Sequence, residues 1–172
     1  MNTLIRTAIA GQYGAALKML RDCLERAAPD AWLAPVGKFP FWHVAYHTLF
    51  ITDMYLSPEE KDFRPQPFHR EDYNLLGPAP WAPQKRPVVD QPYDQQTLVG
   101  YADTCRERAK QALDGEDDAA LAGPSGFHWL PFTRLELHLY NIRHLQHHVG
   151  QLTAALRRQQ GEGVKWTLSE SL

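Results

Sequence analysis

Three histidines lie within five positions of one another in the stretch NIRHLQHHVGQL, residues 141–152. They are His144, His147 and His148. A neutral imidazole is a good ligand for zinc, nickel, copper and ferrous iron, so a metal site is one interpretation of this stretch. A solvated polar patch on a helix is the other interpretation, and composition alone does not separate the two.

Helix geometry divides the three histidines. Successive residues of an α-helix turn by about 100°, which places His144 and His148 about 40° apart. Both lie at the border of the apolar face that contains Leu145 and Val149, whereas His147 falls on the polar side. A pair at i and i+4 can present two imidazoles to one ion. The pattern therefore selects His144 and His148 as candidate ligands and predicts solvent exposure or a supporting role for His147.

A third candidate ligand comes from the stretch FWHVAYHTLF, residues 41–50, where His43 and His47 are again four positions apart. His47 shares its helix face with apolar residues and should point inward, where an imidazole needs a hydrogen-bond partner or a metal. If the two helices are neighbours, His47 can meet the other pair. Three protein ligands leave a coordination position open, as in catalytic zinc sites.

The remaining histidines have simpler interpretations. His138 points inward alone, and a hydrogen-bonded core position explains it. His69 and His128 lie in segments expected to be loops, where surface exposure or loop packing is enough. No role is predicted for His43.

Four segments show the apolar periodicity of α-helices. They are residues 3–27, 41–56, 95–113 and 133–158. Thr133 and Glu136 have the spacing of a capping box at the start of the last segment, and Gly161 should end it. We see no internal repeat and no segment with strand periodicity. The sequence therefore predicts an all-α fold in which four helices form a bundle.

The connection between the second and third helices is long and rich in proline. Eight of the chain's thirteen prolines lie between Pro58 and Pro92. One short helix could start near Ser57, and the rest should lack regular structure. Loops of this length often cover or complete a site. Aromatic residues indicate that it packs onto the body of the protein: Phe63, Phe68, Tyr73 and Trp81. Residues 30–40 and 114–131 are expected to be further irregular connections.

Length and composition set broader limits. The chain has 172 residues, 44% of them hydrophobic, which predicts a single domain spanning 1–172. A net charge of -2 without long runs of one sign argues against nucleic-acid or membrane binding by bulk charge. No signal peptide or membrane span is visible, so a cytoplasmic location is expected. Cys23 and Cys105 form no paired motif and should be buried, inert thiols in a reducing compartment.

Two stretches resemble the DinB-like (DNA-damage-inducible) superfamily of small helical proteins. They read AYHTLFITDMYLS, residues 45–57, and LELHLYNIRHLQHHVGQLTAALRR, residues 135–158. The most specific part is the pattern His-x-x-His-His-x-Gly-Gln from His144 to Gln151. The order of the helices agrees as well, so the resemblance covers most of the chain. The family name refers to induction and implies no DNA binding.

The resemblance implies a four-helix bundle of up-down-down-up topology, often a homodimer. It also implies a divalent metal held by one histidine of the second helix and two of the fourth. Carried over to this sequence, the metal ligands are His47, His144 and His148. The same three residues are selected by helix geometry, and His47 is preferred to His43.

The resemblance further implies the chemistry of metal-dependent thiol transferases that use low-molecular-weight thiols, or of a thiol-dependent isomerase. We therefore expect a thiol S-transferase or a hydrolase that acts on a small molecule with a divalent ion. Zinc or nickel is the expected ion, with iron and manganese as further candidates. Neither Cys23 nor Cys105 has the sequence context of a nucleophile, so a thiol would come from a cosubstrate.

Two other functions remain open. One is a dimeric module that binds a metal or a small molecule without turnover. The other is a structural helical dimer whose histidines form only hydrogen bonds. Asn141 and Gln151 lie one turn from the candidate ligands and could orient them. Three aromatic residues could line a substrate pocket, although ordinary packing explains them as well: Tyr55, Trp81 and Trp129.

Overall fold

The computed structural model describes residues 3–79, 83–84 and 89–172. Within these residues the chain forms six α-helices and one pair of two-residue strands, which confirms the all-α class. The elements in chain order are α1 (Thr3–Arg26), α2 (Pro29–Leu33), β1 (Pro35–Val36), β2 (Phe39–Pro40), α3 (Phe41–Leu56), a 3-10 turn (Glu60–Asp62), α4 (Gln95–Gly115), α5 (Asp118–Ala122) and α6 (Arg134–Gln160).

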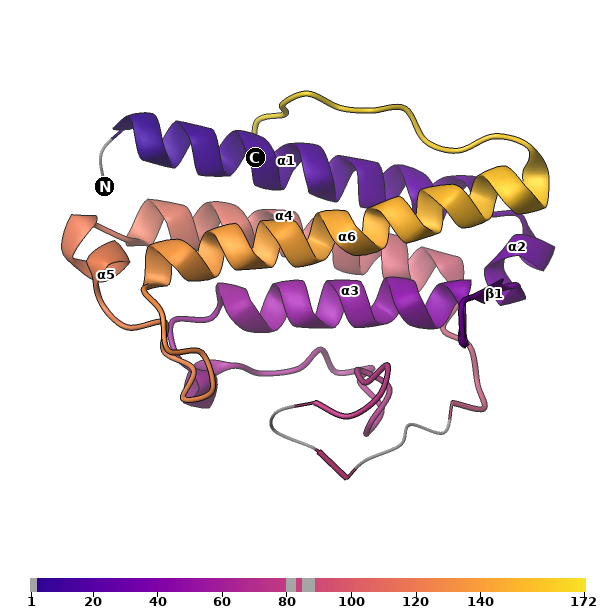
Figure 1. Cartoon of the computed structure of the whole chain (residues 1–172), viewed down its shortest axis with the longest axis horizontal. Coiled ribbons are helices and arrows are strands. Elements are labelled where there is room, and N and C mark those ends of the chain that lie inside the picture. The colour runs from indigo at the N-terminus through magenta and orange to yellow at the C-terminus, as the bar shows by residue number, and fades with distance from the viewer. Residues whose placement is uncertain (1–2, 80–82, 85–88) are drawn as a thin grey trace.

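The four long helices pack side by side (Figure 1). Helix α1 packs against α4 and α6, and α3 packs against the same two helices. In Figure 1, α1 and α6 run from left to right, whereas α3 and α4 run back. Helices α3 and α6 are therefore antiparallel neighbours, and the first half of α3 lies against the middle of α6.

Local sequence signals account for the ends of the long helices. Thr133 caps α6 as predicted, because its Oγ1 accepts a 3.2 Å hydrogen bond from the backbone N–H of Glu136. Gly161 ends the same helix with φ of 82°, a left-handed conformation that favours glycine. Helix α4 begins in the same way, since Asp94 accepts a 2.8 Å bond from the N–H of Thr97.

Two connections that were expected to be irregular contain short elements. Pro29 begins α2 directly after α1, because proline fits the first turn of a helix without losing a needed N–H. Strands β1 and β2 are joined by two residues, and Gly37 permits this tight turn with φ of 67°. In the connection between α4 and α6, Asp117 caps the short helix α5. These elements are too short to show a periodicity in the sequence.

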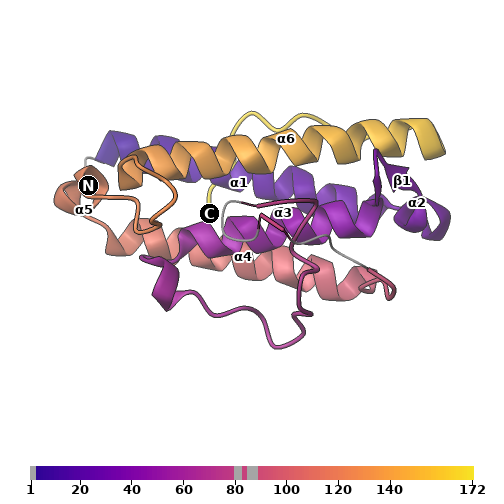
Figure 2. The ribbon, with the colours of Figure 1, turned by 60° about the horizontal axis from the view of Figure 1, so that its bottom comes forward.

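The long connection after α3 lies along the outside of that helix (Figure 2). Apart from the 3-10 turn Glu60–Asp62, close to the predicted short helix, its described residues form no named helix or strand. Its aromatic residues Phe63, Phe68 and Tyr73 pack against the core, as expected. Trp81 lies outside the described residues. Covered in this way, α3 is buried along its whole length, and His47 is its one residue that is only partly buried.

The C-terminal segment after α6 runs back along α1 (Figure 1, yellow). The N–H of Glu170 donates a 3.2 Å hydrogen bond to the carbonyl of Gly11. A Cβ atom on Gly14 would lie 2.0 Å from the carbonyl oxygen of Glu170. Glycine at position 14 is therefore what lets the segment lie flat on α1.

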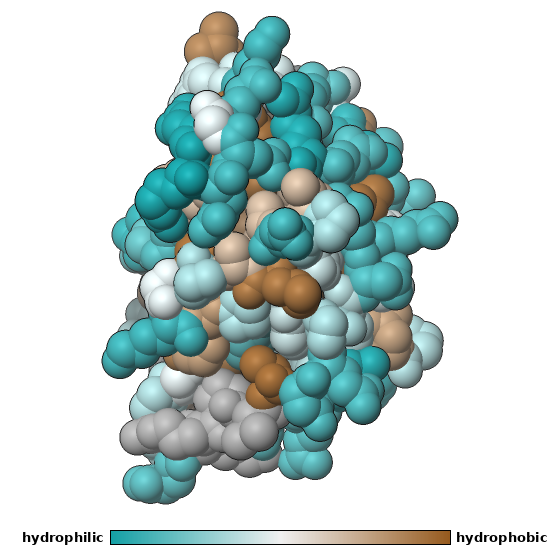
Figure 3. Space-filling view, turned by 90° about the vertical axis from the view of Figure 1, so that its right-hand side faces the viewer, coloured by the Kyte–Doolittle hydropathy of each residue, from teal (hydrophilic) through white to brown (hydrophobic). Residues whose placement is uncertain are grey.

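Hydrophilic side chains dominate one end of the molecule. Figure 3 shows the end of the molecule on the right of Figure 1, where hydrophilic residues cover most of the face and hydrophobic residues form small separate areas. Among the described residues, no helix combines the length and apolar character needed to cross a bilayer.

Candidate metal centre

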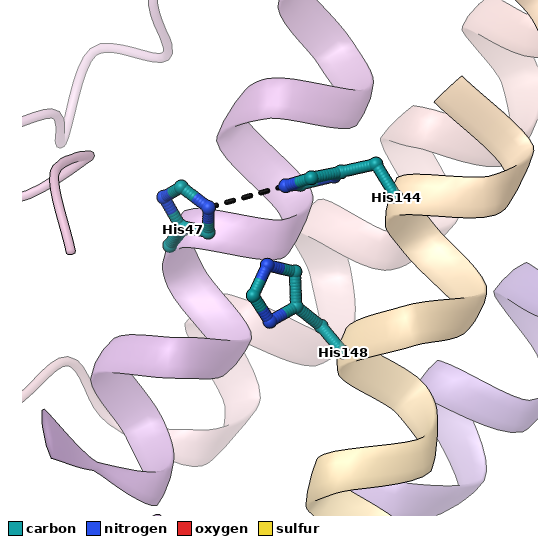
Figure 4. A group of neighbouring side chains, drawn as sticks. All are labelled: His47, His144 and His148. Carbon is teal, nitrogen blue, oxygen red and sulfur yellow. Dashed lines mark hydrogen bonds between the residues drawn. The ribbon is translucent and has the colours of Figure 1, made fainter. Parts of the chain in front are cut away.

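His47, His144 and His148 meet between α3 and α6 (Figure 4). One nitrogen from each ring lies within 4.8 Å of a nitrogen from the other two. The Nε2 atoms of His47 and His144 are 3.2 Å apart. The structure thus brings together the three histidines that the sequence selected, and no other such group of three occurs among the described residues.

The two helices place these rings for simple geometric reasons. His144 and His148 are one turn apart on α6 and project on the same side. Their ring centroids are 4.6 Å apart. Antiparallel packing brings the first half of α3 opposite this turn, so the ring of His47 lies 5.2 Å from that of His144 and 5.0 Å from that of His148. His47 is also the point where α3 opens towards solvent.

Two of the rings are held by hydrogen bonds on their outer nitrogens. The carbonyl of Asn74 accepts a 2.7 Å bond from Nδ1 of His47. The side-chain oxygen of Gln151 accepts a 2.9 Å bond from Nδ1 of His148, while its amide donates to Nε2 of His147 at 3.1 Å. Because both acceptors lack a proton, each Nδ1 carries the hydrogen. The Nε2 lone pairs of His47 and His148 are therefore left for a ligand inside the cluster.

This donor set fits a divalent metal. Two zinc–nitrogen bonds of about 2.1 Å at a tetrahedral angle hold the nitrogens about 3.4 Å apart, close to the spacing of the His47 and His144 Nε2 atoms. Without a metal, Nε2–H of His144 donates a hydrogen bond to Nε2 of His47, and its proton lies between the two nitrogens. A cation that replaced this proton would bind the lone pairs of all three rings.

All three rings remain neutral over the physiological range. Burial lowers the pKa of His144 to about 2, that of His47 to about 3 and that of His148 to about 4. Repulsion between the neighbouring rings lowers the values further, and the bond to Gln151 partly opposes the effect at His148. Neutral imidazole is the form that binds a metal. The three rings therefore do not have to be deprotonated from imidazolium before a metal binds.

These lowered pKa values predict an acid-sensitive fold once metal has been removed. In the unfolded chain each imidazole gains a proton as the pH falls below about 6.5, whereas the folded rings stay neutral until about pH 4. The unfolded state then binds more protons, so the free energy of unfolding decreases from pH 7 to pH 5.

The midpoint of urea unfolding of chelator-treated protein, measured at pH 7, 6 and 5, checks this prediction. The decrease should be smaller in His148→Gln. It should keep its size in His128→Gln, because His128 is exposed and contacts Glu60 outside the cluster. Midpoints that did not change with pH would contradict the neutral, buried state of the three rings.

The other five histidines lie outside the group of three. His138 is fully buried and contacts the Tyr13 hydroxyl and the Glu116 carboxylate. His43 is buried and contacts the carbonyl of Tyr73 at 2.8 Å through Nε2. The two loop residues His69 and His128 contact Tyr46 and Glu60. His147 is exposed and meets the cluster through Gln151 and through a ring contact with His148, with centroids 5.0 Å apart.

The aromatic residues considered for a substrate pocket lie elsewhere or outside the described residues. Tyr55 is buried two turns beyond His47 on α3, and the indole of Trp129 donates to its hydroxyl at 3.4 Å. Their contacts with Phe127 are ordinary packing. Trp81 is among the residues that the structure does not describe.

Both cysteine thiols are buried, as the sequence indicated. Burial raises the pKa of Cys23 to about 11 and that of Cys105 well above its ordinary value. Each thiol also contacts a protein oxygen, that of Thr153 for Cys23 and the carbonyl of Leu49 for Cys105. Neither thiol is therefore a source of thiolate near the cluster.

Sequence reasoning did not find the carbonyl of Asn74. A backbone acceptor carries no residue signature, and its position depends on how the long connection folds back on α3. Gln151, in contrast, was indicated by its spacing one turn after His148.

Comparison with known proteins adds one match. A family model described as the DinB superfamily matches residues 12–152, which include all of α3 and every histidine of the cluster. No curated protein and no solved structure matches the chain.

Proposed function

The chain belongs to the DinB superfamily, and on this basis we propose that it is a divalent-metal-dependent enzyme, a thiol S-transferase or a hydrolase. The metal ligands in this proposal are His47, His144 and His148. The substrate is a small molecule, and a low-molecular-weight thiol is the proposed second substrate. Zinc or nickel is the proposed ion, with iron and manganese as further candidates.

The observation that carries the proposal is the meeting of three neutral imidazoles at one point. Their nitrogens lie within 4.8 Å of one another, and burial holds each pKa at about 4 or below. Three protein ligands leave a position for a substrate in a tetrahedral site. The partial exposure of His47, on a helix that is otherwise buried, supports access from solvent.

A divalent ion supplies Lewis acidity, which lowers the pKa of a thiol or water that it binds. The chain supplies position. Asn74 and Gln151 hold the rings of His47 and His148 with their Nε2 lone pairs turned inward. Because the thiols of Cys23 and Cys105 are buried, we propose that the reacting thiol belongs to a cosubstrate.

One observation favours a second candidate, a module that binds metal or a small molecule without turnover. A cavity of about 600 Å³ lies at the far ends of α3 and α6 from the cluster, where its lining includes Leu56, Ser57, Glu116 and Arg134. None of the three histidines lines it. This separation of the cavity from the cluster favours binding without turnover.

The finer features of the fold are part of the proposal. Pairwise packing of the four long helices supports an up-down-down-up bundle with the proline-rich connection between α3 and α4. We further propose one domain over residues 1–172, a homodimer and a cytoplasmic location. The free state of both cysteines supports a reducing compartment. Light scattering of untagged protein tests the dimer.

A thiol-transfer assay tests the enzymatic proposal. Zinc-loaded or nickel-loaded protein is mixed with a chlorodinitrobenzene and each of several cellular thiols. In the expected reaction a sulfur–carbon bond forms, chloride leaves and the thiol proton passes to the buffer. Turnover should require metal, be lost in His144→Ala and persist in His128→Ala.

Metal-loaded protein that gives no turnover with any thiol or ester would support the non-catalytic module. Turnover that survived complete removal of metal would contradict the proposed chemistry.

A further inference from the structure

Three buried polar atoms between α3 and α6 have no hydrogen-bond partner among the described residues. They are Oγ1 of Thr52, Oδ1 of Asn141 and Nδ1 of His144. Thr52 and Asn141 are completely buried. A buried polar group without a hydrogen-bond partner destabilises the folded state, so these three atoms call for an explanation.

The residues that carry these three atoms are neighbours on α3 and α6. The amide of Asn141 donates a 3.0 Å hydrogen bond to the carbonyl of Thr52, which fixes the orientation of the amide and keeps its oxygen beside Thr52. His144 lies one turn further along α6. The Nε2 atom of His144 points to His47 (Figure 4), and its Nδ1 atom is buried without a partner among the described residues.

The hydroxyl of Tyr13 lies beside the side chain of Asn141, but its proton is already engaged elsewhere. Nε2 of His138 is 2.7 Å from a carboxylate oxygen of Glu116 and therefore carries the proton. The Nδ1 of His138 is then an acceptor, and it accepts a 3.2 Å hydrogen bond from the Tyr13 hydroxyl. Tyr13 has no second proton for the Asn141 oxygen.

We propose that one internal water molecule is bound by Thr52, Asn141 and His144, and that through it Thr52 and Asn141 act as positioning residues for His144. The inference rests on the proposed metal site. Internal waters typically make about three hydrogen bonds, the number that these atoms offer. The water would do for His144 what Asn74 and Gln151 do for the other two rings.

A water suits this position better than a carbonyl, because it can both donate and accept a hydrogen bond. His144 requires both, since its tautomer differs between the metal-free and the metal-bound protein. In the metal-free protein Nε2–H of His144 donates a hydrogen bond to His47, so Nδ1 carries no hydrogen and accepts a hydrogen bond from the water. When Nε2 binds a metal, the proton moves to Nδ1, which donates to the water. In both states the water donates to Asn141 and keeps its bond to the hydroxyl of Thr52.

The first test removes the hydroxyl of Thr52. Thr52→Val keeps the shape of the side chain, and zinc alone is titrated against it in competition with a chelating dye. We expect affinity to fall about tenfold, as when a partner of a metal ligand is lost. Thr52→Ser should restore the wild-type value. Thr48→Val is the matched control, because Thr48 is buried on the same helix and its hydroxyl bonds only to the carbonyl of Val44.

The second test needs no variant. Nitrogen NMR of wild-type protein should show His144 as the Nε2–H tautomer without metal and as the Nδ1–H tautomer with zinc. A high-resolution crystal structure should show one water within hydrogen-bond distance of all three atoms. Zinc binding that is equal in wild type and Thr52→Val, or a crystal structure with no water at this position, would overturn the inference. Wild-type protein that held the water but bound no zinc would instead contradict the proposed function.

Discussion

Replacing His144 with alanine should lower the affinity for zinc by about a hundredfold to a thousandfold. Structural zinc sites with four ligands bind with about 10–16 kcal/mol, or about 2.5–4 kcal/mol for each ligand. A loss of that size corresponds to two or three powers of ten in the dissociation constant. The three ring centroids lie 5.2, 5.0 and 4.6 Å apart, and removal of His144 leaves two ligands that belong to different helices.

Competition with a chelating dye measures this loss on untagged protein. His128→Ala is the control, since this exposed ring pairs only with Glu60 and packs on Trp129. It should bind one ion per chain with wild-type affinity. His147→Ala should show a small loss, because His147 is not one of the three ligands and touches the cluster at its edge, through Gln151 and the ring of His148. Equal affinities in wild type and His144→Ala would exclude the assigned ligands.

Replacing Arg134 with methionine should lower the free energy of unfolding by about 3–5 kcal/mol, the usual effect of breaking a buried charge pair. Arg134 is buried at the start of α6, and its guanidinium donates to the carbonyls of Tyr55, Leu56 and Ser57. These are the free carbonyls at the end of α3. Its Nε also donates a 2.7 Å bond to the carboxylate of Glu116.

The loss has two parts. The carbonyls at the end of α3 lose their donors, and the carboxylate of Glu116 loses one of its two partners in a largely buried position. Thermal unfolding of the metal-free protein should show a midpoint lower by about 10 °C for a chain of this size.

Arg143→Met on the same helix is the matched control for Arg134. Arg143 is exposed and lies over the ring of Tyr140, a contact worth about 0.5–1 kcal/mol. Adding Glu116→Gln to Arg134→Met should recover part of the loss, because it removes the unpaired charge. A loss for Arg134→Met no larger than that for Arg143→Met would contradict the role of this guanidinium at the end of α3.

The helices could be predicted because their signals are local. The periodicity of α6, the cap at Thr133 and the stop at Gly161 are all written within one or two turns. The choice of His144 and His148 over His147 needed only the angle between residues on one helix. The choice of His47 depended on the contact between α3 and α6, which the family resemblance supplied.

Other parts of the site could not be predicted because they depend on contacts distant in sequence. The carbonyl of Asn74 reaches His47 only when the long connection lies along α3. The bond from Asn141 to Thr52 spans two helices and involves a backbone acceptor. The hairpin at Gly37 was missed for another reason, since strands of two residues cannot show alternation.

The central claim is that His47, His144 and His148 bind one ion together. A crystal structure of zinc-loaded, untagged protein, with the metal located by its anomalous scattering, tests it most directly. We predict one ion per chain, about 2.0–2.1 Å from Nε2 of all three rings. A zinc ion bound elsewhere, or the same three rings bonded only to each other and to Asn74 and Gln151 in saturating zinc, would contradict it.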